Sequence, residues 1–153
     1  MADPIAFDSA TARFSLPLLF AGQAQKELTV NESAARLDAV LHACVEGTRS
    51  DPPAAPVEGE CWLVAADGID AWAGRDGCLA SFAGGSWLFV EPRDGIRAYD
   101  RAARNTWFHV GGTWLSPARP ALPLGGATAD SDARTAIAAM YGILATLGLI
   151  PPE

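Results

Sequence analysis

The feature that most constrains this chain is a series of short apolar runs separated by Asp-Gly and Gly-Gly pairs between residues 57 and 117. Glycine supplies the positive φ that primed hairpin turns require, so such pairs between apolar runs are strong hairpin signals. The runs cover residues 57–65, 69–73, 78–82, 86–91, 96–100, 106–110 and 113–116. Seven runs in about sixty residues predict a small antiparallel β meander, either a sandwich or a barrel-like sheet.

Residues 23–46 predict one long helix before this β region. Its apolar positions recur at spacings of four, three, four and three residues, at Val30, Ala34, Leu37, Leu41 and Cys44. That heptad-like rhythm is typical of a helix packed against other helices at a shallow angle. The stripe could cover the chain's own β layer or meet symmetry mates in an oligomer, and two heptads do not decide between these.

A second helix is predicted near the end of the chain. Asp130, Ser131 or Asp132 is suited to its N-cap, and Gly148 with the following prolines ends it. One face is marked by large apolar residues, namely Ile137, Met140, Tyr141, Leu144 and Leu147. Small residues around the remaining face allow another backbone to approach closely.

These patterns divide an α+β chain into five segments. They are a helical oligomerisation segment (1–50), a Pro-rich joint (51–56), a Trp/Gly-rich antiparallel β domain (57–117), a linker (118–129) and a C-terminal helix (130–153). Proline stiffens both joints into extended spacers.

Charge argues against two classes of partner. The formal net charge is −7 and Lys26 is the only lysine. A nucleic-acid surface needs clustered cations, and so does attraction to anionic lipid, so neither partner is expected. No apolar run is long enough to span a bilayer, and the N-terminus lacks an export signal, so synthesis in the cytoplasm is expected.

Catalytic groups are scarce. The chain has 3 cysteines, at widely separated positions, and 2 histidines. We interpret the cysteines as small buried hydrophobic residues rather than a disulfide framework or a metal site. Two carboxylates at a suitable separation could hydrolyse a glycosidic bond. The candidates all lie in or beside turns, where Asp is favoured for its local backbone hydrogen bonds. They are Asp67, Asp70, Asp76, Asp94 and Asp100. The sequence therefore predicts no enzyme, no metal and no cofactor.

All five tryptophans lie in the β region. In so small a layer they are expected to fill the core, with each indole N–H bonded to a carbonyl. The alternative is an aromatic platform for sugar rings. Trp72 and Trp87 lie beside Gly-rich turns, so they are the candidates to reach solvent and contact carbohydrate.

A polar cluster precedes the apolar stripe of the first predicted helix. It contains Gln23, Gln25, Lys26, Glu27, Asn31 and Glu32. Amide side chains offer a donor and an acceptor together, which suits buried hydrogen bonds between subunits, although a solvated first turn is equally compatible. The candidate interface residues are Gln23, Gln25, Lys26, Val30, Asn31, Leu37, Leu41, Met140 and Leu144.

The segment that contains this polar cluster, together with several later ones, resembles a known family. The segment Ala-Gly-Gln-Ala-Gln-Lys-Glu at 21–27, followed by Asn31-Glu32, Leu37-Asp38, Pro52-Pro53, Gly59, Ala71-Trp72-Ala73-Gly74 and Gly85-Ser86-Trp87, is similar to a domain of formally unknown function. That domain occurs in prophage structural gene clusters and in gene transfer agents, phage-like particles that carry host DNA. The similarity runs from about residue 12 to residue 116. Val30 stands where the family often has histidine, which weakens a metal or acid–base role there.

The resemblance implies a virion component. Short members look like the base of a head spike or head fibre, docked on the capsid exterior after assembly in the bacterial cytoplasm. The implied partners are further copies in a ring of three or five, the major capsid protein at a vertex, and a longer fibre that binds host capsular polysaccharide. The alternative function is a carbohydrate-binding module that contacts the polysaccharide itself through exposed tryptophans.

Overall fold

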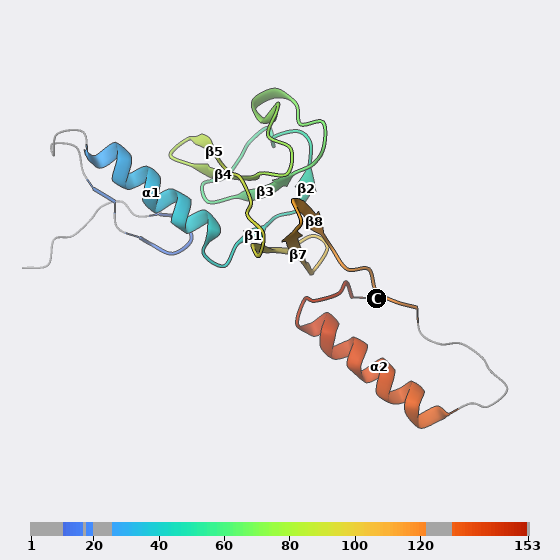
Figure 1. Cartoon of the computed structure of the whole chain (residues 1–153). Helices are drawn as coiled ribbons and strands as arrows, with labels where there is room; N and C mark the ends of the chain where they lie inside the picture. Colours follow the sequence, from blue (N-terminus) through green and yellow to red (C-terminus); the bar gives the residue numbers. More distant parts are fainter. Residues whose placement is uncertain (1–10, 17, 20–25, 122–129, 153) are drawn as a thin grey trace, which may run out of the picture. The chain divides into compact units, whose positions relative to one another are not determined.

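The computed structural model describes residues 11–16, 18–19, 26–121 and 130–152 (Figure 1). Within them lie two α-helices, a short 3₁₀ turn and eight strands in two sheets, which confirms an α+β fold with a β-rich centre. The elements are α1 (Lys26–Val40), β1 (Cys44–Val45), β2 (Thr48–Arg49), β3 (Cys61–Val64), η1 (Asp70–Trp72), β4 (Leu79–Ala83), β5 (Ser86–Val90), β6 (Arg97–Asp100), β7 (Asn105–Val110), β8 (Thr113–Leu115) and α2 (Ser131–Thr146). Neither described helix has the length and apolar content that a bilayer crossing requires.

The chain divides into two compact units, Met1–Pro92 and Arg93–Glu153. In the first unit the sheet order is β2-β3-β4-β5. The hairpin β4–β5 turns through Gly84 and Gly85, whose φ values are +60° and +75°. Positive φ at both central residues is the signature of the predicted two-residue turn, and Ala83 pairs with Ser86 across it.

Parts of the predicted meander are wrong. Residues 69–73 do not form a strand, because Asp70–Trp72 make a 3₁₀ turn that places Trp72 in the core. Strand β2 pairs with β3 in parallel, with Thr48 opposite Leu63, so the sheet is not wholly antiparallel. Strands β1 and β2 contradict the prediction that residues 1–50 form a helical segment.

Tryptophan fills one face of the first unit's sheet. Trp72 is fully buried with Val64 and Ala80, and Trp62, Trp87 and Phe89 pack against them. Side chains alternate along β3 and β4, so the opposite face carries Cys61, Leu63 and Leu79, all buried. Burial raises the pKa of the Cys61 thiol to about 12. Cys61 and Cys78 are buried, as predicted, whereas Cys44 is only half-buried.

Helix α1 ends earlier than predicted, at Val40 rather than near residue 46. Gln23 and Gln25 lie outside the described residues. His42 then has a φ of +47°, which is incompatible with a continuing helix, and Cys44–Val45 is already strand. The carbonyls freed at this end are bonded by Arg13, which lies far away in the sequence.

The second unit contains the antiparallel strands β6, β7 and β8. The hairpin β7–β8 turns through Gly111 and Gly112, as predicted. Asp130 is the N-cap of α2, and its Oδ1 accepts the N–H groups of Asp132 and Ala133. The helix ends at Thr146 with Leu147 as its C-cap, and Gly148 follows directly as the predicted stop.

The end of α2 is fixed by a Schellman motif. The N–H of Gly148 donates to Ala145 and the N–H of Leu149 to Leu144. Gly148 has a φ of +66°, and a Cβ there would lie 2.7 Å from Cε2 of Tyr99 in β6. Glycine is therefore required both by the motif and by the close approach of this turn to β6.

Asp94 gives the second unit a measurable dependence on acid pH. Its carboxylate accepts the N–H groups of Gly112 and Gly111, and Nδ1 of His109 lies 3.0 Å away. These contacts lower the pKa of Asp94 below its ordinary value of 3.8. A depressed pKa means that the stabilisation is present above about pH 4 and is lost as the pH falls through the folded-state pKa.

We therefore expect the amide exchange of Gly111 and Gly112 to accelerate as the pH falls from about 5 to about 3, after correction for intrinsic exchange. In Asp94→Asn the two amides should exchange faster at pH 5 and show little further change. Asp76→Asn, which removes a comparable turn carboxylate from the first unit, is the control. A wild-type profile as flat as that of Asp94→Asn would contradict the assignment.

Candidate functional site

A buried carboxylate on α1 organises the chain segment that precedes the helix. Asp38 is only 6% exposed. Its side chain accepts hydrogen bonds from the Thr11 hydroxyl (2.7 Å) and from the N–H groups of Arg13 (3.0 Å) and Phe14 (2.8 Å). Three donors compensate the desolvation of this carboxylate, and they fix the turn at residues 11–14 against the helix.

The Arg13 side chain also joins the segment before the helix to α1. Its guanidinium donates to the carbonyls of Asp38, Ala39 and His42, at 2.5, 3.1 and 2.8 Å. These carbonyls lie at the C-terminal end of α1, which has no basic residue in its last turn. An arginine there satisfies acceptors that the helix leaves open and complements the negative end of its dipole.

Asn31 holds Leu19, the last described residue of the segment that precedes α1. Its amide oxygen accepts the N–H of Leu19 at 2.8 Å, and its amide nitrogen donates to the Leu19 carbonyl at 3.0 Å. We call Thr11, Arg13, Asn31 and Asp38 the N-terminal clasp. The Asn31 amide thus makes one accepted and one donated hydrogen bond within the chain. Its predicted contact with another subunit stays a prediction.

Gly59 lets the clasp approach the sheet. Its φ is +86°, and a Cβ there would lie 2.7 Å from Cβ of Ala12. Real Cβ atoms do not approach so closely, so any side chain at this position would displace the segment. In the sequence, Gly59 and Asp38 stand out only as parts of the family pattern, and no motif includes Arg13.

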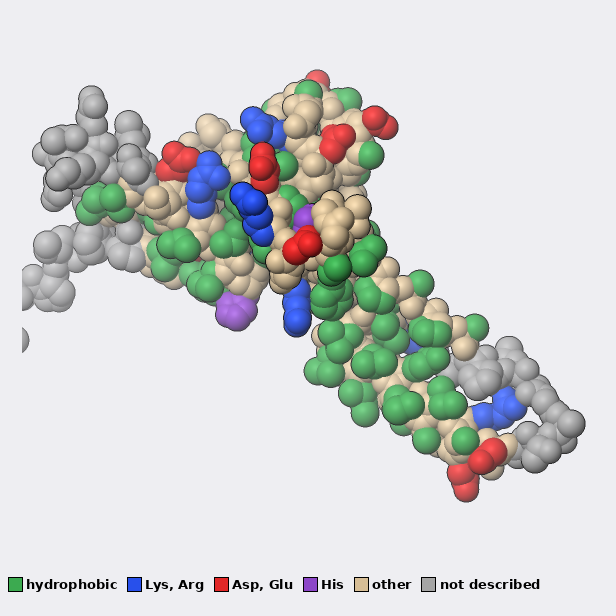
Figure 2. Space-filling model, in the orientation of Figure 1, with side chains coloured by type: hydrophobic (Ala, Val, Ile, Leu, Met, Phe, Trp, Pro, Cys, Tyr) green, Lys and Arg blue, Asp and Glu red, His purple; other side chains and the backbone are tan. Residues whose placement is uncertain are grey.

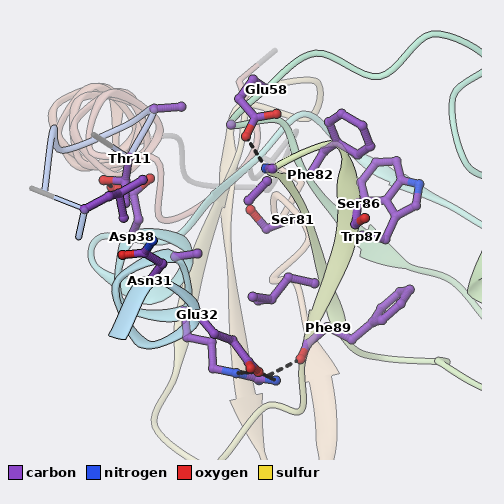
Figure 3. Close-up of a pocket in the computed structure, with 18 of the residues that line it drawn as sticks. Thr11, Asn31, Glu32, Asp38, Glu58, Ser81, Phe82, Ser86, Trp87 and Phe89 are labelled. Atoms are coloured by element: carbon purple, nitrogen blue, oxygen red, sulfur yellow. Dashed lines mark hydrogen bonds and ion pairs between the residues drawn. The ribbon is translucent and has the colours of Figure 1, made fainter. Parts of the chain in front are cut away.

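Beside the clasp lies a pocket of about 620 Å³. Figure 3 shows it between α1 and the β4–β5 hairpin, with Trp87 and Phe89 pointing away from the helix. Its polar lining includes Glu32, Arg36, Glu58, Arg75 and Ser81. Glu58 accepts the N–H of Gly84 at the hairpin tip, and Arg36 pairs with Glu32 at 2.8 Å.

Three of the five aspartates considered for a glycosidase pair accept hydrogen bonds from backbone N–H groups. In the described part of the chain no group of three or more His, Cys, Asp or Glu side chains could hold a metal ion. The predicted turn role is confirmed for Asp76, Asp94 and Asp100, whose carboxylates accept backbone N–H groups of nearby turns. These carboxylates are engaged in local structure.

The two candidate carbohydrate tryptophans differ. The expectation that Trp72 reaches solvent is wrong: its side chain is fully buried, because the 3₁₀ turn directs it into the core. Its indole N–H also has no hydrogen-bond partner among the described residues, in contrast to the expected carbonyl. Trp87 is half-buried and packs edge-to-face on Trp72 and Phe82, at centroid distances of 5.0 and 5.1 Å. A sugar contact through Trp87 stays a prediction.

The remaining candidate interface residues fall into two rows. On α1 and the turn after it, Val30, Leu37 and Leu41 are exposed, Leu37 by 59%. On α2, Met140 is exposed together with Ile143 and Leu147, whereas Leu144 is half-buried. Gln23 and Gln25 lie outside the described residues, and only the backbone of Lys26 is described.

A family model for a protein of unknown function (DUF2793) matches residues 30–115. The chain belongs to the DUF2793 family. The match extends from the middle of α1 to the end of β8, so it includes Asn31, Asp38, Gly59 and the β4–β5 hairpin. Segment 21–27, which carried much of the resemblance in the sequence, and helix α2 lie outside it. Neither the comparison with curated proteins nor that with solved structures gives a match.

Proposed function

We propose that this DUF2793 protein is a virion structural subunit, the base of a capsid-attached head spike or fibre in a phage-like particle. In this role it forms a ring of identical copies, docks on the major capsid protein and holds a longer fibre that binds host polysaccharide. The resemblance to prophage and gene-transfer-agent proteins supports the class. Self-assembly is supported by two rows of mostly exposed apolar side chains, one on α1 and one on α2.

Both rows have the spacing of a coiled-coil seam. Along α1 and its following turn the row is Val30, Ala34, Leu37 and Leu41, and along α2 it is Ala136, Met140, Ile143 and Leu147. Steps of four, three and four residues keep the side chains on one stripe that packs well against another helix. The hydrophobic side chains gathered along α2 are visible in Figure 2.

Helix α2 especially needs a covering partner. None of its residues is buried, and Leu147, its C-cap, is 64% exposed. No charged residue occurs from Thr135 to Pro152, so the row has no cationic face for lipid or nucleic acid. An apolar helix without a polar face is typical of the interior of an assembly.

Charge placed in the rows tests this role. Leu37→Glu and Ile143→Glu each introduce a carboxylate into an apolar contact, and we expect the combined variant to sediment as a monomer. A desolvation penalty of roughly 3 kcal/mol per site corresponds to about a hundredfold weaker association.

Val57→Glu is the matched control, because Val57 is 62% exposed but lies outside both helices. It should assemble like the unchanged protein. If the combined variant keeps the unchanged protein's mass, the two rows do not drive assembly.

Electron microscopy of particles tests the class of function. Particles produced without this protein should lack a surface projection and should recover it when the protein is added back. Particles that keep every projection would refute the proposal.

A further inference from the structure

Among the described residues, no strand pairs with the outer edge of β5 in the first unit's sheet. The sheet order ends at β5 on that side. In a hairpin with a two-residue turn, the two residues that flank the turn exchange backbone hydrogen bonds. In the next pair along the ladder, the backbone N–H and C=O groups point away from the partner strand. Ala83 and Ser86 flank this turn, so the backbone groups of Trp87 and Phe89 face away from β4.

A hydrogen bond to Phe89 supports this assignment. The Phe89 carbonyl accepts Nη1 of Arg36 at 3.1 Å, from α1 and not from a strand. Arg36 therefore occupies one acceptor of the edge. The N–H of Phe89 and both backbone groups of Trp87 remain directed toward the pocket side.

The pocket borders this edge. Four consecutive residues, Ser86 to Phe89, line it although their side chains alternate between the two faces of the sheet. Glu32, Ala35 and Arg36 of α1 form the facing wall. A volume of about 620 Å³ is suited to a short extended segment of a few residues.

The groove carries opposite charges at its two ends. Glu58 lies at the hairpin tip, where it accepts the Gly84 N–H. At the other end the guanidinium of Arg75 lies 5.0 Å from the Phe89 ring centroid, and among the described residues it has no ion pair. An extended ligand would be favoured with a carboxylate beside Arg75 and a cation toward Glu58.

We propose that this groove binds an extended segment of a partner protein, which adds as a strand to β5 and presents a carboxylate to Arg75. Backbone hydrogen bonds to Trp87 and Phe89 supply affinity, and the charges select orientation. The inference rests on the proposed function only in that a spike base needs a protein partner. The groove lies apart from the helix rows, so its failure would not affect self-assembly.

The test uses the full chain and three blocked peptides. The first is Lys-Thr-Val-Thr-Val-Asp, and the second has the lysine and the aspartate exchanged. The third is the better binder of these two with proline in place of its second threonine. Proline removes a backbone donor, so it reports strand pairing. Backbone amide shifts of Trp87 and Phe89 are followed by NMR during each titration.

We expect one charge order to bind with a Kd of roughly 0.1–1 mM and the proline peptide at least tenfold more weakly. Arg75→Ala should remove the preference between the two charge orders, whereas Arg97→Ala, in the second unit, should retain it. Arg75→Ala also removes the contact of Arg75 with the Phe89 ring, but the loss of that contact alone would not abolish the preference for one charge order.

Several results would overturn the proposal. One is no shift at Trp87 or Phe89 at about 5 mM peptide, and another is equal binding of the proline peptide. Exchange protection of the two amides in the free chain that disappears on deletion of residues 1–10 would assign the groove to this chain's own N-terminus. Protection that rises with protein concentration would assign it to a second copy.

Discussion

Replacing Asp38 with alanine is expected to destabilise the first unit by about 3 kcal/mol and to release residues 11–14 from α1. The carboxylate accepts three hydrogen bonds from Thr11, Arg13 and Phe14, and its removal leaves these donors without a partner. The measurement is chemical denaturation, with the amide exchange of Arg13 and Phe14 as a local probe.

Two further variants sharpen this result. Asp38→Asn keeps the shape but weakens the acceptor, so an intermediate loss is expected. Glu32→Ala is the control on the same helix: it breaks an exposed pair with Arg36, and such pairs contribute about 0.3–0.5 kcal/mol. If Asp38→Ala unfolds at the same denaturant concentration as Glu32→Ala, the clasp does not stabilise the unit.

Gly59→Ala is expected to cost about 3 kcal/mol, compared with about 1 kcal/mol for Gly74→Ala. Both glycines have positive φ, but only at Gly59 would a Cβ meet another atom, at 2.7 Å from Ala12, whereas Gly74 faces open space. The difference between the two variants therefore measures the close approach of the N-terminal segment. Thermal and denaturant unfolding of both variants provide the comparison.

A second substitution separates contact from backbone strain. Ala12→Gly removes the atom that the new Cβ would strike, so in the Gly59→Ala background it should recover most of the difference between the two glycine variants. No recovery in the double variant would show that the contact with Ala12 is not the cause.

The correctly predicted features depend on local sequence. The Asp130 cap, the Gly148 stop and the hairpin turns at Gly84-Gly85 and Gly111-Gly112 each follow from a few neighbouring residues. Their geometry is set by φ preferences and by hydrogen bonds that span two to five positions. Sequence patterns report such interactions directly.

The wrong predictions concern contacts between distant residues. The end of α1 is set by Arg13, whose guanidinium binds carbonyls about two dozen residues later in the chain. The bonds between Asn31 and Leu19 also join residues 12 positions apart, and no local pattern in the sequence reports them. Trp72 lies beside a glycine turn, yet the 3₁₀ conformation buries it.

The apolar rows illustrate a pattern whose meaning required the fold. A heptad-like stripe on α1 was compatible with covering the β layer or with assembly. In the structure the buried side of α1 is Asp38 and Ala39, while Leu37 lies on the exposed side. Val30, Leu37 and Leu41 of the stripe are exposed in the described part of the chain, whereas Ala34 and Cys44 are half-buried.

We propose that this protein functions as one subunit of an assembly of identical chains. Sedimentation equilibrium of the 153-residue chain at tens of micromolar gives its mass in solution. We expect a single species whose mass is a whole multiple, three or five, of the 16.0 kDa chain. A species of 16.0 kDa across that concentration range would contradict the account.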